Sequence, residues 1–343
     1  MESRIIQKKD IANLLNRLSA GYEILAPVER DSIILFEAIT SGDEAILDYH
    51  NSKIPPKRAL FAQKETLFRY SSAKDADKIE VPPAPEKPRL IFGIHPCDAR
   101  SFTLLDRVFD GVYQDPYYLQ RRANTIVVSL GCLKPGAGCF CTSVGGGPFS
   151  TEGSDIMLTD IGDEYLAQAL TDRGRQLLAD APETVAATED ELSLAQQVTG
   201  NAEAAIPPVL NTEGLKEKLD SLSAAPVWHS LAEKCLGCGV CTYLCPTCHC
   251  FDIVDERAGD GGERLRIWDS CQFPLFTLQA SGMNPRHTVK ERLRQRVMDK
   301  FSYTVDHHGR ISCVGCGRCV TECPVNLDIR RVVNTILEVK ASG

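Results

Sequence analysis

The chain has 343 residues, a formal net charge of −8 and 15 cysteines, so it is longer than one ordinary domain and should fold as two or three units. No apolar run approaches the ~20 residues that span a bilayer, and the start MESRIIQKKD lacks the apolar stretch of a signal peptide. Direct membrane insertion and a disulfide scaffold are therefore disfavoured, and we expect a cytoplasmic protein.

The first part of the chain, residues 1–165, has the pattern of an α/β domain. Strands are predicted over 32–38, 89–94 and 125–130, which are rich in β-branched and other apolar residues, and a helix over 99–108 connects the last two. If these two strands are parallel neighbours, the residues that follow them meet at the carboxyl edge of the sheet, where open α/β sheets bind ligands.

Four cysteines follow these strands. Cys97 lies just after the first and Cys132 just after the second, and Cys139 and Cys141 come a few residues later, before the glycine turn 145–147. Four thiolates suffice for an iron–sulfur cluster, so we predict one at this set. We name it the third centre, because two further cysteine sets, described below, are named the first and second. The spacing is not that of a ferredoxin run, which leaves a zinc site or simple buried thiols as alternatives.

An acidic stretch separates the two ends of the chain. Residues 155–222 carry 14 acidic residues against 4 basic ones, and 182–208 have few large apolar side chains, so we interpret 166–225 as an acidic helical or linker segment. Farther on, four basic residues share one helical pattern without interleaved aromatic residues, and this pattern does not support a nucleic-acid partner. We expect these residues to form either a solvated helix face or a docking face for an acidic partner subunit. They are Arg292, Arg294, Arg296 and Lys300.

The last part of the chain carries one motif twice. Cys235-x-x-Cys238-x-x-Cys241-x-x-x-Cys245-Pro246 recurs as Cys313-x-x-Cys316-x-x-Cys319-x-x-x-Cys323-Pro324. Three cysteines at intervals of three reach three corners of a [4Fe-4S] cube, and in two-cluster ferredoxins the cysteine before the proline ligates the other cube. We therefore predict two [4Fe-4S] clusters with crossed ligation. The first centre takes Cys235, Cys238, Cys241 and Cys323, and the second takes Cys313, Cys316, Cys319 and Cys245.

Three cysteines remain outside these sets: Cys248, Cys250 and Cys271. They could form a three-thiolate site with His249 or Asp269, replace one of the predicted ligands, or pack beside the clusters as thiols that tune their potentials. We favour the last interpretation.

Helical patterns surround the repeated motif. Helices are predicted over 227–234, 287–301 and 326–339, and the wide separation of the two cysteine runs is unlike a compact ferredoxin. We therefore expect an α-helical ferredoxin-type domain with two [4Fe-4S] clusters over residues 226–343, following the α/β domain.

Several stretches together resemble a known family, the beta subunits of cytoplasmic sulfhydrogenases, which includes the A-type subunit of anaerobic sulfite reductase and related subunits beside flavin and heterodisulfide reductase modules. The resemblance spans roughly residues 90–343. It rests on GIHPCD (93–98), GCLKPGAGCFC (131–141), CLGCGVCTYLCPTCHCFDI (235–253), RIWDSCQF (266–273), GMNPR (282–286) and CVGCGRCVTECPVNLDI (313–329).

What the resemblance implies is an electron-transfer component of a multisubunit oxidoreductase. Such a component stands between an FAD- and NAD(P)-binding flavoprotein and a catalytic subunit of the hydrogenase, sulfur or sulfite reductase, or heterodisulfide reductase type. Two alternatives stay open. The chain could itself reduce sulfur or polysulfide at the third centre, or it could be an iron–sulfur redox-sensing module. No G-x-G-x-x-G or P-loop motif is present, so a nucleotide site in this chain is weakly supported.

Overall fold

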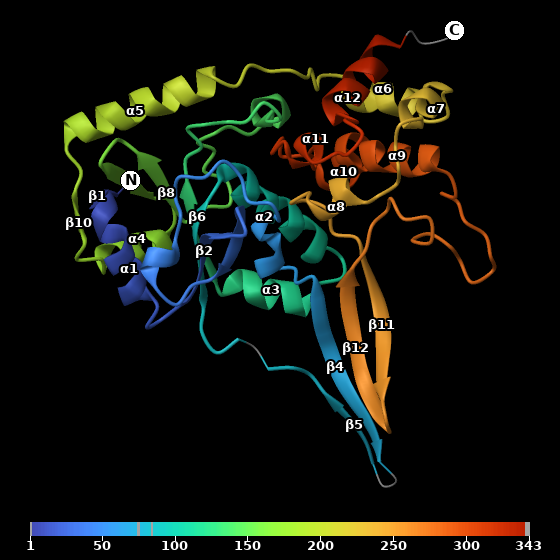
Figure 1. Ribbon diagram of the computed structural model, residues 1–343, viewed down its shortest axis with the longest axis horizontal. Coiled ribbons are helices and arrows are strands. Elements are labelled where there is room, and N and C mark those ends of the chain that lie inside the picture. Colours follow the sequence, from blue (N-terminus) through green and yellow to red (C-terminus); the bar gives the residue numbers. More distant parts are fainter. Residues whose placement is uncertain (1, 74–75, 84, 340–343) are drawn as a thin grey trace.

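The computed structural model describes residues 2–73, 76–83 and 85–339. The N-terminal half is built on an eight-stranded sheet with the strand order β10-β1-β9-β8-β7-β6-β2-β3 (Figure 1). Its four middle strands, β8, β7, β6 and β2, are parallel, and the outer pairings are antiparallel. The strands are β1 (Ser3–Gln7), β2 (Glu23–Arg30), β3 (Ile33–Ala38), β6 (Arg89–Ile94), β7 (Thr125–Leu130), β8 (Ile156–Asp160), β9 (Glu164–Ala169) and β10 (Thr184–Ala186).

The central strands agree with the sequence pattern. β6 and β7 cover the predicted runs 89–94 and 125–130, and the helix that connects them, α2 (Pro96–Phe109), contains the predicted 99–108. Their pairing is parallel, with Arg89 opposite Thr125. β7 is buried along its whole length, as expected for a strand covered on both faces. The α/β character of the N-terminal half is therefore confirmed.

Helices and apolar side chains cover the sheet on both faces. One core contains Leu90, Val128 and Leu158 with α1 (Ile11–Leu18), and the other contains Ile91 and Val127 with α2 and α3 (Pro116–Ala123). The other helices of this half are α4 (Asp172–Ala179) and α5 (Glu189–Ala204).

The stretch interpreted as a helical or linker segment, residues 166–225, contains more than a linker. Most of β9 and all of β10 lie in it and pair with β1 in the sheet. α5 then begins at a Thr188–Glu191 capping box and passes along the outside of the sheet toward the C-terminal half (Figure 1).

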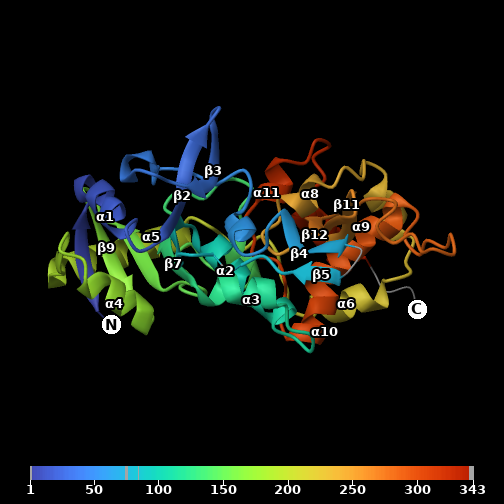
Figure 2. The same cartoon turned by 90° about the horizontal axis from the view of Figure 1, so that it is seen from below.

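In the described part of the C-terminal half there are seven helices and one π-helical turn. Figure 2 shows these helices beside the sheet along the long axis of the molecule. They are α6 (Leu215–Ser221), α7 (Val227–Ala232), α8 (Val240–Tyr243), α9 (Val289–Met298), α10 (Thr304–His308), α11 (Arg318–Thr321) and α12 (Ile329–Glu338), and the π turn covers Asp299–Tyr303. α6, α7, α9, α12 and the π turn contribute to a third apolar core.

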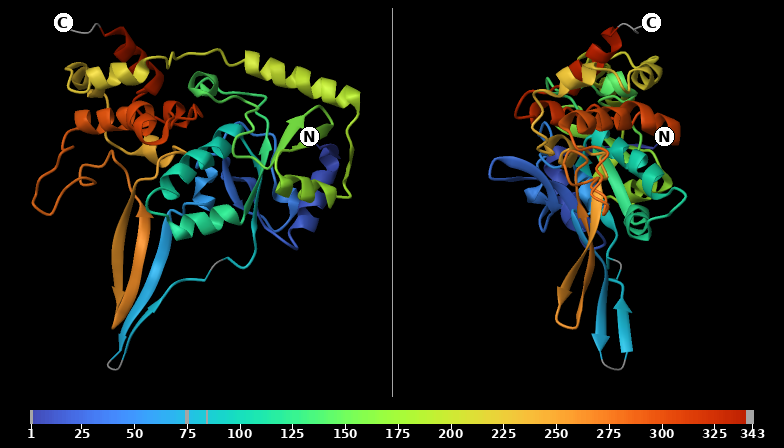
Figure 3. Two further views of the ribbon diagram at one scale, coloured as in Figure 1. Left: turned by 180° about the vertical axis from the view of Figure 1, so that it is seen from behind. Right: turned by 90° about the vertical axis from the view of Figure 1, so that its right-hand side faces the viewer.

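This half also contains β-strands, so the expected α-helical ferredoxin-type class describes it only in part. Residues 251–268 form the hairpin of β11 (Phe251–Ala258) and β12 (Gly261–Trp268), and β12 pairs with β4 (Lys64–Ala73), which in turn pairs with β5 (Ala76–Glu80). The resulting four-stranded sheet projects from the body as a narrow arm (Figures 1 and 3). Because its strands come from both halves, the two halves are joined by backbone hydrogen bonds as well as by core packing.

Candidate iron–sulfur centres

The two cysteine runs fold as the same turn. Gly237 and Gly315 both have φ of 65°, and Gly239 and Gly317 have φ of 77° and 78°, a left-handed conformation that glycine adopts at little cost. A short helix follows each turn, α8 in the first run and α11 in the second. The sequence repeat is therefore also a repeat of backbone geometry.

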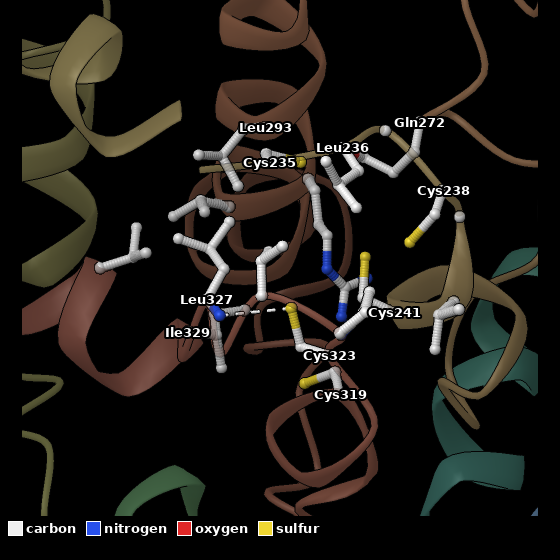
Figure 4. Close-up of a pocket in the computed structure, with 18 residues that line it drawn as sticks. Cys235, Leu236, Cys238, Cys241, Gln272, Leu293, Cys319, Cys323, Leu327 and Ile329 are labelled. Atoms are coloured by element: carbon white, nitrogen blue, oxygen red, sulfur yellow. Dashed lines mark hydrogen bonds between the residues drawn. The ribbon is translucent and has the colours of Figure 1, made fainter. Parts of the chain in front are cut away.

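The first centre is a pocket lined by the three leading cysteines of the first run together with Cys323 of the second. Figure 4 shows the sulfur atoms of Cys235, Cys238, Cys241 and Cys323 around it. The backbone N–H of Leu327 donates to Cys323 Sγ at 3.2 Å. Cys319 also lines the pocket, so five thiols border it, and the proximity of Cys323 to the first run is the arrangement that crossed ligation requires.

Buried guanidinium groups flank this pocket. Arg296 lines it, and Arg292, also buried, has an Nε atom without a hydrogen-bond partner among the described residues. Burial raises the pKa of Cys241 to about 12, and Arg296 opposes this rise. A thiolate-ligated iron–sulfur cluster is anionic overall, so the donor set and its positive surroundings fit such a group.

The second centre brings Cys245 to the second cysteine run. Cys245 Sγ lies 3.2 Å from Thr247 Oγ1, which donates to the carbonyl of Ser312 at 2.6 Å, directly before Cys313. Burial, followed by the nearby Cys319 and Cys245, raises the pKa of Cys313 to about 12. Cys245 thus lies beside the run that the crossed assignment gives it.

The third centre packs directly against the second. Phe140 N–H donates to the Gly315 carbonyl at 2.8 Å, and Cys139 Sγ lies 3.8 Å from the Cys316 carbonyl oxygen. A Cβ on Gly315 would lie 2.5 Å from the backbone nitrogen of Cys141. The loop that carries Cys139 and Cys141 therefore touches the second cysteine run backbone to backbone.

The four thiols of the third centre gather at the carboxyl edge of the sheet. Burial, then Cys139 and Cys141, raises the pKa of Cys132 to about 12. Burial also raises the pKa of Cys97, and both Cys316 and Cys132 add to this rise. The sequence placed Cys97 and Cys132 at this edge because both follow parallel strands, and β6 and β7 are indeed parallel neighbours; a cluster held by all four cysteines stays a prediction.

A buried ion pair connects the second and third centres. Arg318, between Cys316 and Cys319 in the chain, donates to both carboxylate oxygens of Asp98 at 2.6 Å, and Asp98 follows Cys97. Arg318 also donates to the Ser52 carbonyl and hydroxyl. Sequence reasoning missed this bridge, because nothing in the local pattern of either residue indicates a partner more than two hundred positions away.

The basic residues of α9 and the following π turn do not form a solvated face. Arg292, Arg296 and Lys300 are all buried. For these three residues, the expected solvated face and the expected docking face for an acidic partner are therefore both wrong. Arg294 is the exception, since it donates to the Ser223 carbonyl nearer the surface. The helix turns its cations inward because they meet thiols and backbone carbonyls there.

The remaining cysteines lie on a cavity of their own. Cys248, Cys250 and Cys271 line a space of about 120 Å³ together with His249, Arg296 and Lys300. Lys57, a buried residue without any local sequence signal, donates to the carbonyls of Cys245 and Cys248 at 2.8 and 2.6 Å.

Some of the thiols of these centres border cavities: five line the pocket of the first centre, and Cys139 and Cys316 line another. Within the described ranges, no three His, Cys, Asp or Glu side chains could hold a single metal ion. In the same part of the chain, no helix is long and apolar enough to cross a membrane.

Comparisons with known proteins support iron–sulfur binding in the C-terminal half. Residues 234–327 match the family model of a 4Fe-4S dicluster domain. Over 327 residues the chain is 34% identical to sulfhydrogenase 2 subunit beta of Pyrococcus furiosus, covering 94% of this chain and 95% of that protein. No solved structure matches. The thiol sets, the dicluster match and the near full-length similarity show that this chain belongs to the family of sulfhydrogenase beta subunits.

Proposed function

We propose that this chain is the iron–sulfur electron-transfer subunit of a multisubunit oxidoreductase, and that it relays single electrons between an FAD/NAD(P)-binding flavoprotein and a catalytic subunit. The catalytic subunit is of the hydrogenase, sulfur or sulfite reductase, or heterodisulfide reductase type. The observation that carries the proposal is the serial contact of three cysteine sets. Cys319, assigned to the second centre, also lines the pocket of the first centre. Phe140, in the cysteine loop of the third centre, donates its N–H to the carbonyl of Gly315 in the second cysteine run.

The cofactors proposed for this series are two [4Fe-4S] clusters at the first and second centres and a third at Cys97, Cys132, Cys139 and Cys141. Bound clusters of this kind accept and release one electron at a time. The protein's own contribution is to bury the thiols, to place cations near them and to keep neighbouring centres in contact.

One end of the series reaches the surface. Cys238 of the first centre is exposed, and Leu236, which lines the same pocket, is 67% exposed. Exposed apolar side chains at a redox centre are suited to contact with a partner subunit, so we assign the exchange of electrons with one partner to this end.

Two measurements test the proposal. Anaerobic purification of the chain from its native source should recover it with a flavoprotein and a catalytic subunit, and reduced dye should not drive polysulfide reduction by the isolated chain. Recovery solely as a monomer, or sustained turnover without partners, would overturn the relay.

The third cluster has its own test. Cys97→Ser and Cys139→Ser should each lower iron by about four atoms per chain, measured together with acid-labile sulfide. Unchanged iron in both variants would remove the third centre from the series.

A pocket beside the third centre supports a second candidate function. A space of about 590 Å³ at the carboxyl edge of the sheet is lined by Cys132, His95 and Lys134. His95 stacks on Tyr49 at 4.4 Å, and burial lowers its pKa. If this chain itself reduces sulfur compounds, this is where they would bind, and the dye assay on the isolated chain separates the two functions.

A further inference from the structure

Eight of the 15 cysteines belong to the first and second centres and four to the third. The other three, Cys248, Cys250 and Cys271, face one cavity of about 120 Å³. This is more than the cavity of about 40 Å³ at the first centre. The three thiols come from two segments, one directly after the first cysteine run and one directly after β12, so tertiary folding brings them together.

The cavity is positively charged. Arg286, Arg296 and Lys300 line it, against the single carboxylate of Asp299. Arg296 is 5% exposed and Lys300 1%. Burying a cation is costly unless an opposite charge or hydrogen-bond acceptors compensate it. The lining therefore favours an anionic occupant.

Arg296 and Lys300 bond to thiol and hydroxyl groups and not to carboxylates in the described part of the chain. Arg296 Nη1 lies 3.4 Å from Cys248 Sγ, and Lys300 Nζ donates to the hydroxyls of Thr247 and Ser312 at 2.9 and 3.3 Å. In the described part of the chain neither forms an ion pair with a carboxylate, whereas the equally buried Arg318 and Arg266 pair with Asp98 and Glu65.

Local backbone geometry directs one of these cations inward. Lys300 lies in the π-helical turn Asp299–Tyr303, and such turns within helices occur often at functional sites. His249 lines the same cavity, and its Nδ1 lies 3.3 Å from the Thr247 carbonyl. Since a carbonyl only accepts, Nδ1 is the donor and Nε2 keeps its lone pair, which is the arrangement found in metal-ligating histidines.

We propose that this cavity is a fourth cluster site, in which an iron–sulfur cluster is held by the thiolates of Cys248, Cys250 and Cys271 and by the imidazole of His249. The inference depends on the cavity, its ligands and its unpaired cations, and not on which partner subunits the chain has. Arg296 borders both this cavity and the first centre, so the fourth site branches from the series near its exposed end.

The test compares full-length, anaerobically prepared protein with the double variant Cys250→Ser/Cys271→Ser. The double variant should lose about four iron atoms per chain while the EPR signals of the other clusters persist. Phe276→Leu is the matched control, because Phe276 lines the same cavity without a ligating atom, and it should keep all the iron. Equal iron in the double variant and the unaltered protein would overturn the proposal.

A second variant covers the case in which the double variant does not fold. His249→Cys keeps a ligating side chain, so iron should stay unchanged while pulsed EPR of the reduced protein loses a nitrogen coupling. Absence of any nitrogen-coupled cluster in the unaltered protein would contradict the assignment. Because both readouts are differences between variants, they remain decisive even if the third centre or the partner assignment fails.

Discussion

Single charged residues set the environment of every centre. Arg296 and Lys300 lie among thiols, Arg318 lies between the second and third centres, and Lys57 bonds to the carbonyl of a predicted ligand, Cys245. Hydrogen bonds and positive charge near the sulfurs are among the factors that set cluster potentials. The buried cations therefore take part in the proposed relay.

The first prediction at this scale concerns crossed ligation. Cys323→Ser should perturb the EPR signal of the cluster bound by Cys235, Cys238 and Cys241, because Cys323 lines their pocket. Cys319→Ser is the comparison, since Cys319 lines the same pocket but is assigned to the second centre. Damage to the first centre by Cys319→Ser and not by Cys323→Ser would reverse the assignment.

The second concerns the buried pair of Asp98 and Arg318. Asp98→Asn leaves a buried guanidinium without its counter-charge, and removal of one partner from such a pair costs about 3–5 kcal/mol. We expect a clearly lower denaturation midpoint, followed anaerobically by cluster absorbance. Glu322→Gln is the control, because Lys53–Glu322 is a partly exposed pair worth about 0–1 kcal/mol. Equal decreases of the denaturation midpoint in the two variants would show that the buried pair stabilises the protein no more than the partly exposed pair does.

Among the secondary-structure elements, those with strong local patterns were predictable. The runs at 89–94 and 125–130 are apolar and β-rich, and they form β6 and β7. The repeated cysteine motif likewise folds twice in the same way, with matching turns before α8 and α11. The hairpin of β11 and β12 was missed, although Gly259 and Asp260 mark its turn, because the pairing that stabilises it comes from distant β4. Inward cations such as Lys300 were missed for the same reason, since a helical pattern alone does not say which face is buried.

Contact between the two cysteine loops gives the prediction at the scale of elements. Gly315→Ala adds a Cβ that would lie 2.5 Å from Cys141 N, at a φ of 65°. It should reduce iron at both the second and third centres. Gly282→Ala has a similar φ of 82° but open space around its Cβ, so it carries the backbone strain without the crowding. Similar iron loss in both variants would show that strain alone is responsible.

Across the whole molecule, we predict that the two halves differ in how far their stability depends on bound iron. β6 and β7 lie within apolar cores. The C-terminal helices also have an apolar core, but the loops that carry the cysteines lie beside a thiol-lined pocket. Anaerobic removal of iron with a chelator should therefore expose the amides of the cysteine loops to hydrogen exchange while β6 and β7 stay protected. Uniform loss of protection would show that the sheet also depends on the clusters.

The arm formed by β4, β5, β11 and β12 has a consequence for biosynthesis. β4 leaves the ribosome well before β12, the strand at residues 261–268 with which it pairs. The edge of β4 that later pairs with β12 is therefore unpaired during much of translation. An unpaired edge is prone to association with other chains. Lys57, near β4 in the chain, likewise cannot bond to the carbonyls of Cys245 and Cys248 until these residues have been synthesised. Cluster insertion near these cysteines can therefore be completed in native surroundings only after both halves have been synthesised, and a nascent chain that stalls between them would present an open strand edge to the cell.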